Sequence, residues 1–308
     1  MEGKEIIYEF LDYISYEKKY SDNTEKNYEL DLFKYFEYLD KNNLNYLTVK
    51  YKDVSNFTLF LAKQNYKSTT INRIDSSIRS FYNYLELEEK INGNPFKAAS
   101  NLKVPKRLPN YFKYDEYLTM ISVIDKDDYE YRNRLILEML FATGLRVSEL
   151  SNIKIKDIDF SEGEIKIMGK GSKERFVFYN KECAIVLDSY LKECRSKLLN
   201  GKDSEYLFIN HLGNKLTDRG IRLIIDKIVK KSCIKSKVSP HTFRHTFATH
   251  MLSNGCPLKS VQELLGHASL SSTEIYTHIT DDYIKSEYLK NMPRRWKSID
   301  NNNYFWYI

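Results

Sequence analysis

Apolar side chains recur at helical spacing through the first hundred residues of the chain. The sets are Ile6, Ile7, Phe10, Leu11 and Ile14; Leu32, Phe33, Phe36 and Leu39; Phe57, Phe60 and Leu61; and Ile71, Ile74, Ile78, Phe81 and Leu85. Spacings of three and four residues place each set on one face of a helix. Ser68 has the residue type of an N-cap before the last helix. We therefore predict a helical domain over residues 1–100.

The pattern changes after this domain. The segment from Asn92 to Asn110 interrupts the helical spacing with prolines and basic residues, and we place a linker at 101–110. An amphipathic helix is expected over 127–143, ended by Gly144. Isoleucines at 165 and 167 and phenylalanines at 176 and 178 alternate around a glycine-containing turn, which predicts a β-hairpin. From about residue 217 the pattern is helical again. The chain is expected to be mainly α with a small β-sheet, with a second domain over 111–292 and a tail over 293–308.

Charge is distributed unevenly along the chain. The net charge of the whole chain is +6, but residues 165–259 hold 19 Lys and Arg against 8 Asp and Glu. Such a segment can attract a polyanion, although a lysine-rich solvated surface has the same composition. Five polar residues are candidate DNA contacts, for which an ordinary polar helix face is the alternative: Arg73, Arg79, Thr217, Arg219 and Arg222.

Composition also limits the cellular context. No apolar run approaches the roughly 20 residues that span a bilayer, and the start of the chain (MEGKEIIYEF) lacks the basic and apolar regions of a secretory signal. We therefore expect a cytoplasmic protein without a membrane partner. The four cysteines show no metal-ligand spacing, so they are expected to be free thiols.

The string SPHTFRHTFATH predicts a helix start that can bind an anion. Ser239 can cap the helix with Pro240 at its first position, and His241 and Arg244 then lie one turn apart where free N–H groups favour a phosphate. A zinc site at His241 and His245 is the rival interpretation. It is disfavoured because the glutamate of a metalloprotease motif is missing and a cationic arginine lies between the two histidines. A structural role for His241 is a further alternative.

Five other residues complete the candidate chemistry. Arg146 follows a predicted helix break, and Glu149 can reach back to orient it. Lys170 is expected at the tip of the hairpin, where an ammonium can act as a general acid or simply be solvated. His267 follows a glycine that is expected to end a helix over 257–265. With 25 tyrosines in 308 residues, Tyr276 means little without its neighbours.

The strings ATGLRVSEL, GKGSKER, HTFRHTFATH and LLGHASLSSTEIYTH together resemble the catalytic segments of tyrosine recombinases, the phage integrase family, and those of its Xer group most closely. The resemblance covers about residues 1–290. It implies a helical, SAM-like core DNA-binding domain over 1–100 and a catalytic α+β domain over 111–292. A C-terminal helix over 281–291 would dock on a neighbouring protomer, and the tail at 293–308 goes beyond the usual pattern.

The resemblance also implies a role for each candidate residue. Tyr276 would attack the scissile phosphate to give a 3′-phosphotyrosyl bond, and Arg146 and Arg244 would bind the non-bridging oxygens. Lys170 would protonate the leaving oxygen. The two histidines, 241 and 267, would assist proton transfer and bind the phosphate, and Glu149 matches the acidic position that supports the site. Neither a metal ion nor a nucleotide cofactor would be needed.

The implied partners are a double-stranded recombination site and further protomers. Four protomers, with or without a paralogous recombinase, would exchange strands through a Holliday junction. The task could be the resolution of chromosome or plasmid dimers, as in chromosome partition at cell division, or the integration or inversion of a mobile element. Two alternatives remain open at this point, a type IB topoisomerase-like nicking enzyme and a non-catalytic DNA-binding accessory protein.

Overall fold

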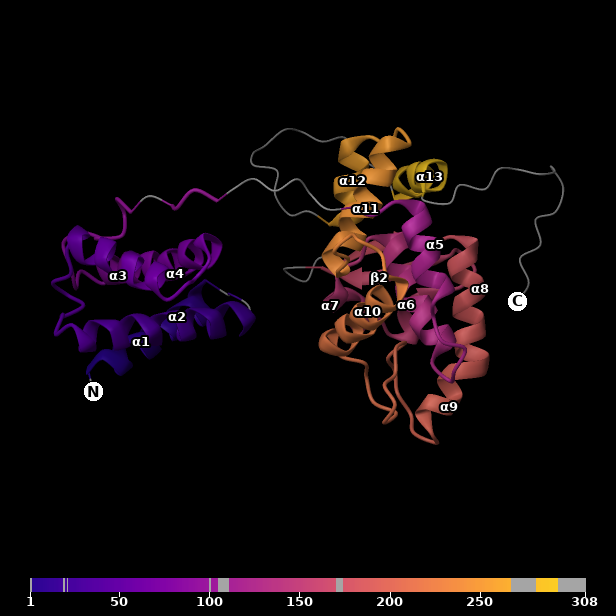
Figure 1. The fold of residues 1–308 in the computed structure, drawn as a ribbon, viewed down its shortest axis with the longest axis horizontal. Coiled ribbons are helices and arrows are strands. Elements are labelled where there is room, and N and C mark those ends of the chain that lie inside the picture. Colours follow the sequence, from indigo (N-terminus) through magenta and orange to yellow (C-terminus); the bar gives the residue numbers. More distant parts are fainter. Residues whose placement is uncertain are drawn as a thin grey trace. The chain divides into compact units, whose positions relative to one another are not determined.

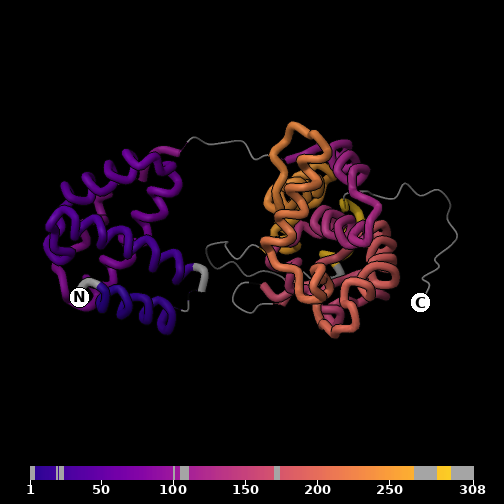
Figure 2. The backbone as a smooth tube through the Cα atoms, turned by 60° about the horizontal axis from the view of Figure 1, so that its bottom comes forward, coloured from indigo at the N-terminus to yellow at the C-terminus, as the bar shows by residue number. Residues whose placement is uncertain are grey.

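The computed structural model describes residues 2–18, 20, 22–99, 101–104, 111–169, 174–266 and 281–292. The chain divides into two compact units, residues 1–107 and 108–308. The helices of each unit gather into a body of their own (Figure 1, Figure 2). None of the described helices is long and apolar enough to cross a membrane.

The N-terminal unit is helical, as predicted. Its elements are α1 (Glu2–Asp12), the π-helical turn η1 (Tyr13–Glu17), α2 (Asp22–Lys41), α3 (Tyr51–Lys63) and α4 (Ser68–Leu87). The apolar sets of the sequence meet in a single core that is rich in aromatic rings. The predicted cap at Ser68 was wrong by one position, because Lys67 is the N-cap and Ser68 the first helical residue.

The polar face of α4 holds the segment that follows the helix. Asn72 exchanges two hydrogen bonds with the main chain of Leu102, at 2.9 and 2.8 Å. The Arg79 guanidinium donates to the carbonyl oxygens of Phe96 and Ala99, at 3.0 and 3.1 Å. Part of the helix face that was a candidate for DNA contact therefore holds Phe96, Ala99 and Leu102 within the unit.

The C-terminal unit surrounds a buried central helix. Its elements are α5 (Tyr114–Ser122), α6 (Glu130–Thr143), α7 (Val147–Ser151), η2 (Ile155–Asp157), β1 (Ile158–Asp159), β2 (Glu164–Met168), β3 (Glu174–Phe178), α8 (Lys181–Ser189), η3 (Tyr190–Arg195), α9 (Ser196–Leu199), α10 (Asp218–Ser232), α11 (Pro240–Ser253), α12 (Leu258–Leu265) and α13 (Asp281–Asn291). The expected amphipathic helix over 127–143 begins later, at Glu130, and its residues from 135 onward are all buried. A helix that is apolar on all sides lies inside a domain, and α6 packs against α8 and α11.

The predicted hairpin is confirmed as part of a three-stranded antiparallel sheet in the order β1-β2-β3. Ile165 pairs with Val177, and Ile167 pairs with Arg175. Side chains directly opposite each other share a face of the sheet, so Arg175 lies on the same face as three buried aliphatic residues. On the other face, Phe178 packs against Tyr288 of α13.

Candidate active site

Arg146 lies at the break between two helices. Gly144 ends α6 in the left-handed conformation, with φ of +63°, and Arg146 is the extended N-cap residue of α7. A side chain at Gly144 would be strained, and its Cβ would come within 2.6 Å of Phe247 and 2.9 Å of Leu265. Glycine therefore permits both the turn and the close approach of α11 and α12. The Arg146 side chain remains 40% exposed, open to a ligand.

Glu149 holds this arginine in place. Its carboxylate accepts the main-chain N–H of Arg146 at 2.8 Å and the Arg146 Nη1 donor at 2.8 Å. The expectation that Glu149 reaches back to orient Arg146 agrees with this geometry. Burial by itself would raise the pKa of Glu149, but the hydrogen bonds and charges of Arg175 and Arg146 outweigh burial and hold the pKa below its ordinary value.

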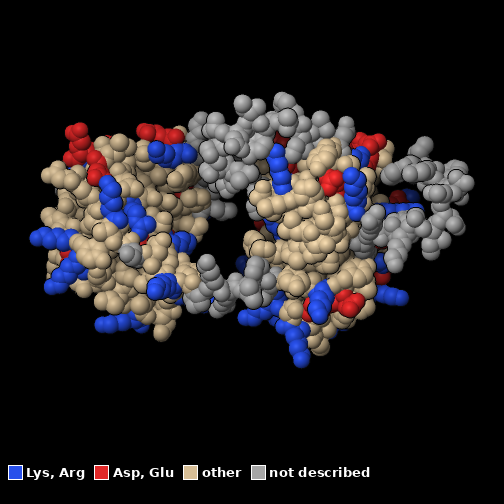
Figure 3. All heavy atoms as spheres, turned by 90° about the horizontal axis from the view of Figure 1, so that it is seen from above, with Lys and Arg blue, Asp and Glu red and all other residues tan. Residues whose placement is uncertain are grey.

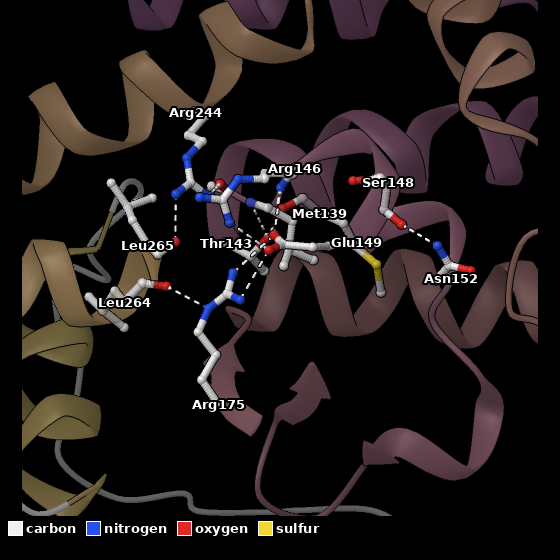
Figure 4. A network of polar contacts seen from close by, with 12 residues as sticks. Met139, Thr143, Arg146, Ser148, Glu149, Asn152, Arg175, Arg244, Leu264 and Leu265 are labelled. Carbon is white, nitrogen blue, oxygen red and sulfur yellow. Dashed lines mark hydrogen bonds and ion pairs between the residues drawn. The ribbon is translucent and has the colours of Figure 1, made fainter. Parts of the chain in front are cut away.

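Arg244 lies beside Arg146 and comes from α11. Its Nη1 donates to the carbonyl of Gly144 at 3.0 Å, and its Nη2 to that of Leu265 at 2.5 Å. Burial, and then the charge of Arg146, lower the pKa of Arg244 to about 10. An anion between the two guanidiniums would oppose this effect. Figure 4 shows both arginines directed toward the region of Glu149.

His241 is placed by the start of α11. The Ser239 hydroxyl accepts the N–H of Thr242, and Pro240 occupies the first turn, as the sequence predicted. His241 is exposed and lies one helical turn before Arg244. Phe243, buried on the same helix, anchors it in the core. The first turn of α11 therefore presents an imidazole to solvent, one helical turn from Arg244.

Arg175 is a third arginine of this cluster, and the sequence did not single it out. Its Nη1 and Nη2 donate to the two oxygens of Glu149 at 3.1 and 2.9 Å, and its Nε donates to the carbonyl of Leu264 at 3.4 Å. A charged residue at a strand position that faces the core requires a partner. The inward-facing position of Arg175 in β3 could therefore have identified it as a candidate. Three guanidiniums therefore surround one carboxylate (Figure 4), with an excess of positive charge.

A pocket of about 1020 Å³ begins at Arg146 and continues along β2. Its basic lining residues are Arg146, Lys154, Lys156 and Lys166, and it includes Gly169, the last described residue before Lys170. The sequence analysis did not identify these three lysines as candidates. The lining also includes three acidic residues, Glu149, Asp157 and Glu174. Lys166 forms an ion pair with Glu174 at 2.8 Å, so the pocket has little excess of positive charge away from Arg146.

Three of the six candidate residues, Lys170, His267 and Tyr276, lie outside the described residues. The elements that flank them in the chain are described. Lys170 comes between β2 and β3. His267 follows Gly266, which ends α12 as predicted and has the left-handed conformation. The tail at 293–308 also lies outside the described residues.

The five candidate DNA contacts differ in how far their side chains are engaged within the protein. Arg73 is exposed and forms an ion pair with the buried carboxylate of Asp31. Thr217 caps α10 by accepting the N–H of Gly220 at 3.1 Å, and Arg219 and Arg222 are exposed on that helix. Arg79 is engaged with carbonyl groups, as described above. These contacts give Arg79 and Thr217 structural roles, and DNA contact by all five residues stays a prediction.

Comparison with family models decides the assignment. Residues 110–282 match the phage integrase family, and residues 7–89 match the N-terminal SAM-like domain of phage integrases. The chain belongs to the phage integrase family of tyrosine recombinases. The match includes every residue of the candidate active site and all four helices of the N-terminal unit in whole or in part.

Similar proteins indicate to which group of tyrosine recombinases the chain belongs. The tyrosine recombinase XerC of Oceanobacillus iheyensis is 43% identical over 289 residues, which cover 92% of this chain and 95% of the relative. XerC of Listeria monocytogenes is 42% identical, over 95% of this chain and 99% of the relative. The protein is a site-specific tyrosine recombinase of the Xer type. The topoisomerase-like and non-catalytic alternatives are not favoured.

Solved structures agree in fold. XerH recombinase bound to a palindromic difH substrate matches with a TM-score of 0.68 and 25% identity, over 80% of this chain and 73% of that chain. A lambda integrase dimer bound to a core site matches with a TM-score of 0.66 over 90% of this chain and 99% of that one. At 16% identity, the second likeness concerns the fold alone. The mainly helical architecture with a small sheet is thus that of tyrosine recombinases.

Proposed function

We propose that this recombinase cleaves DNA with Tyr276 as the nucleophile and Arg146 and Arg244 as the phosphate ligands. The Tyr276 oxygen attacks phosphorus and forms a 3′-phosphotyrosyl bond, while the bond to the 5′ oxygen breaks and that oxygen leaves as a hydroxyl. Lys170 supplies its proton. His241 assists proton transfer, and His267 donates a hydrogen bond to the phosphate.

One observation carries the proposal for the arginines. Arg146 and Arg244 come from different helices, yet both guanidiniums lie beside a single carboxylate, that of Glu149, which cannot neutralise both together with Arg175. Preorganised donors of this kind stabilise charge that develops on phosphate oxygens. They supply positive charge that many other nucleases take from metal ions. The energy of the phosphodiester is kept in the phosphotyrosyl bond, so no ATP is required.

We further propose that the two units act together on a double-stranded recombination site. We assign core DNA binding to residues 1–100, a linker to 101–110, catalysis to 111–292 and a tail to 293–308. On the face of the N-terminal unit that Figure 3 shows, most lysine and arginine side chains lie over its middle and lower part, and acidic side chains lie mainly along its upper edge, with further basic side chains beside them. This separation of charge supports a DNA-facing side.

The assembly that we propose is a tetramer on two sites, formed by this chain alone or with a paralogous recombinase. The solved Xer relative is a complex with its difH substrate. Since the XerC relatives match over nearly the whole chain, we propose the resolution of DNA dimers as the task. A circular substrate with two directly repeated sites should then be converted into two circles, and failure on every cognate site would contradict the task.

Covalent trapping tests the chemistry. The full chain is incubated with a nicked suicide substrate that carries its recombination site, and denaturation-resistant adducts are counted. Wild-type protein is expected to form the adduct, and Tyr276→Phe is expected to form none. Tyr283→Phe is the matched control, because Tyr283 is an exposed tyrosine of α13 seven positions along the chain. Adduct formation by Tyr276→Phe would overturn the assignment of the nucleophile.

A further inference from the structure

Arg175 connects three elements of the site. It projects from β3, chelates the carboxylate of Glu149 in α7 through both Nη atoms, and donates through Nε to the carbonyl of Leu264 in the last turn of α12. Figure 4 shows this side chain between the other two residues. A planar guanidinium can make all three bonds at once, whereas an ammonium group offers no matching fork.

The end of α12 also rests on this side chain. Gly266 has φ of +63°, and a Cβ added there would lie 3.0 Å from the Cδ and Nε atoms of Arg175. The backbone of Gly266 therefore lies against the stem and head of the arginine. Because Gly266 immediately precedes His267 in the sequence, Arg175 fixes the point from which the following segment of the chain departs.

Arg175 is more buried than Arg146, one of the two proposed phosphate ligands. Its side chain is 14% exposed, and that of Arg146 is 40% exposed. Three of the five N–H groups that a guanidinium carries are engaged with Glu149 and Leu264. The carboxylate of Glu149 is itself 7% exposed, so it needs a buried counter-charge to remain ionised beside Arg146. Arg175 is suited to supply that charge, not to contact DNA.

We propose that Arg175 is a positioning residue for DNA cleavage. It holds the Glu149 carboxylate in the orientation that fixes Arg146, and it ties that carboxylate to the C-terminal end of α12. The inference rests on the proposed role of Arg146 as a phosphate ligand. Displacement of a catalytic group by about 1 Å can cost roughly 100-fold in rate, and loss of Arg175 is expected to have an effect of this order on cleavage while DNA binding is retained.

The test compares two arginine-to-lysine variants in the full chain. Arg195 is the matched control, because it also donates to main-chain carbonyls, those of Leu207, Ser204 and Tyr206, and does not contact Glu149. DNA affinity and the single-turnover rate of adduct formation at saturating DNA are measured separately. Arg175→Lys is expected to lower the rate roughly 100-fold with unchanged affinity, and Arg195→Lys is expected to leave both unchanged. Equal rates for the two variants would overturn the proposal.

A double-mutant cycle distinguishes positioning from a general effect on folding. In a Glu149→Gln background, Arg175→Ala can no longer misplace the carboxylate, so its cost in cleavage rate should be smaller than in the wild-type background. The contacts of Arg175 with Leu264 and Gly266 are lost in both backgrounds. The same cost in both backgrounds would contradict the proposal. Wild-type protein that forms no Tyr276 adduct would instead contradict the proposed function, so the two failures are distinguishable.

Discussion

Arg244 donates a hydrogen bond of 2.5 Å through Nη2 to the carbonyl oxygen of Leu265, the last residue of α12. The guanidinium that we propose as a phosphate ligand thus also holds the helix that ends just before His267 in the chain. Its other N–H groups donate no hydrogen bond to the described residues, and we propose that they bind the phosphate. The proposed phosphate binding and the position of the end of α12 would therefore be linked through a single side chain.

Replacement of Arg244 by lysine tests whether this side chain both binds the phosphate and holds the end of α12. An ammonium cannot satisfy the carbonyls of Gly144 and Leu265 and a phosphate together in the geometry of a guanidinium. Loss of one preorganised donor in such a site costs roughly 100- to 1000-fold in rate, and a loss of this size is expected for single-turnover adduct formation by Arg244→Lys. A wild-type rate would contradict the role of Arg244.

Glu149 should contribute stability that depends on pH. Its pKa in the folded protein lies below the ordinary value of 4.5, because the bonds to Arg175 and Arg146 outweigh burial. A group with a lowered folded pKa stabilises the protein above its unfolded pKa, and this contribution is lost as the pH falls through the folded value. Glu149→Gln is expected to lose about 2 kcal/mol at pH 7, and the difference from wild type should shrink toward pH 3. Urea unfolding at the two pH values measures it, and an equal difference at both would count against the ion pairs.

Asp75 should have the opposite dependence on pH. This buried residue of α4 has one carboxylate oxygen without a hydrogen-bond partner among the described residues, and burial raises its pKa from 3.8 to about 6. The protonated form is favoured on folding, so the stabilising contribution is complete below pH 3.8 and is lost as the pH rises through about 6.

The isosteric variant Asp75→Asn should therefore gain stability relative to wild type as the pH rises. A shift of about two pKa units corresponds to about 3 kcal/mol, which sets the upper limit of the relative gain between pH 4 and pH 8. Urea unfolding of the N-terminal unit is the measurement. A relative stability that does not change with pH would show that Asp75 is ionised in the folded unit without penalty.

A side chain at Gly266 should slow DNA cleavage for a reason other than backbone strain. Gly266 and Gly255 both have positive φ, but an added Cβ at Gly255 meets nothing within 4 Å, whereas at Gly266 it meets Arg175. The alanine variants of both should lose about 1 kcal/mol of stability from backbone strain. Only Gly266→Ala is expected to slow adduct formation, because Arg175 cannot move without breaking its bonds to Glu149. Equal cleavage by the two variants would contradict the contact.

Local signals in the sequence predicted the helix ends that position the described part of the candidate site. Caps and helix ends depend on a few neighbouring residues, so Ser239, Gly144 and Gly266 could be placed without tertiary information. The reach of Glu149 to Arg146 spans three residues and was predictable for the same reason. The assignment to the tyrosine recombinases followed from the motif set as a whole, and the family match confirmed it.

The remaining features depend on contacts that are distant in sequence. Arg175 acquires its role only when β3, α7 and α12 meet, and the register that places it opposite Ile167 is set by the whole hairpin. The alternation of apolar residues predicted the hairpin but not its register, in which Val177 pairs with Ile165. Arg79 and Asn72 resembled a DNA-facing surface until the fold brought residues 94–102 onto them.

The central claim is that Tyr276 carries the covalent bond to DNA, and mapping of that bond tests it most directly. The adduct from a nicked suicide substrate is digested with protease and nuclease, and the modified peptide is fragmented in a mass spectrometer. The account predicts that the nucleotide remnant is attached to Tyr276, and that Arg175→Lys forms the same adduct more slowly. A remnant on Tyr283 or on any other of the 25 tyrosines would contradict it.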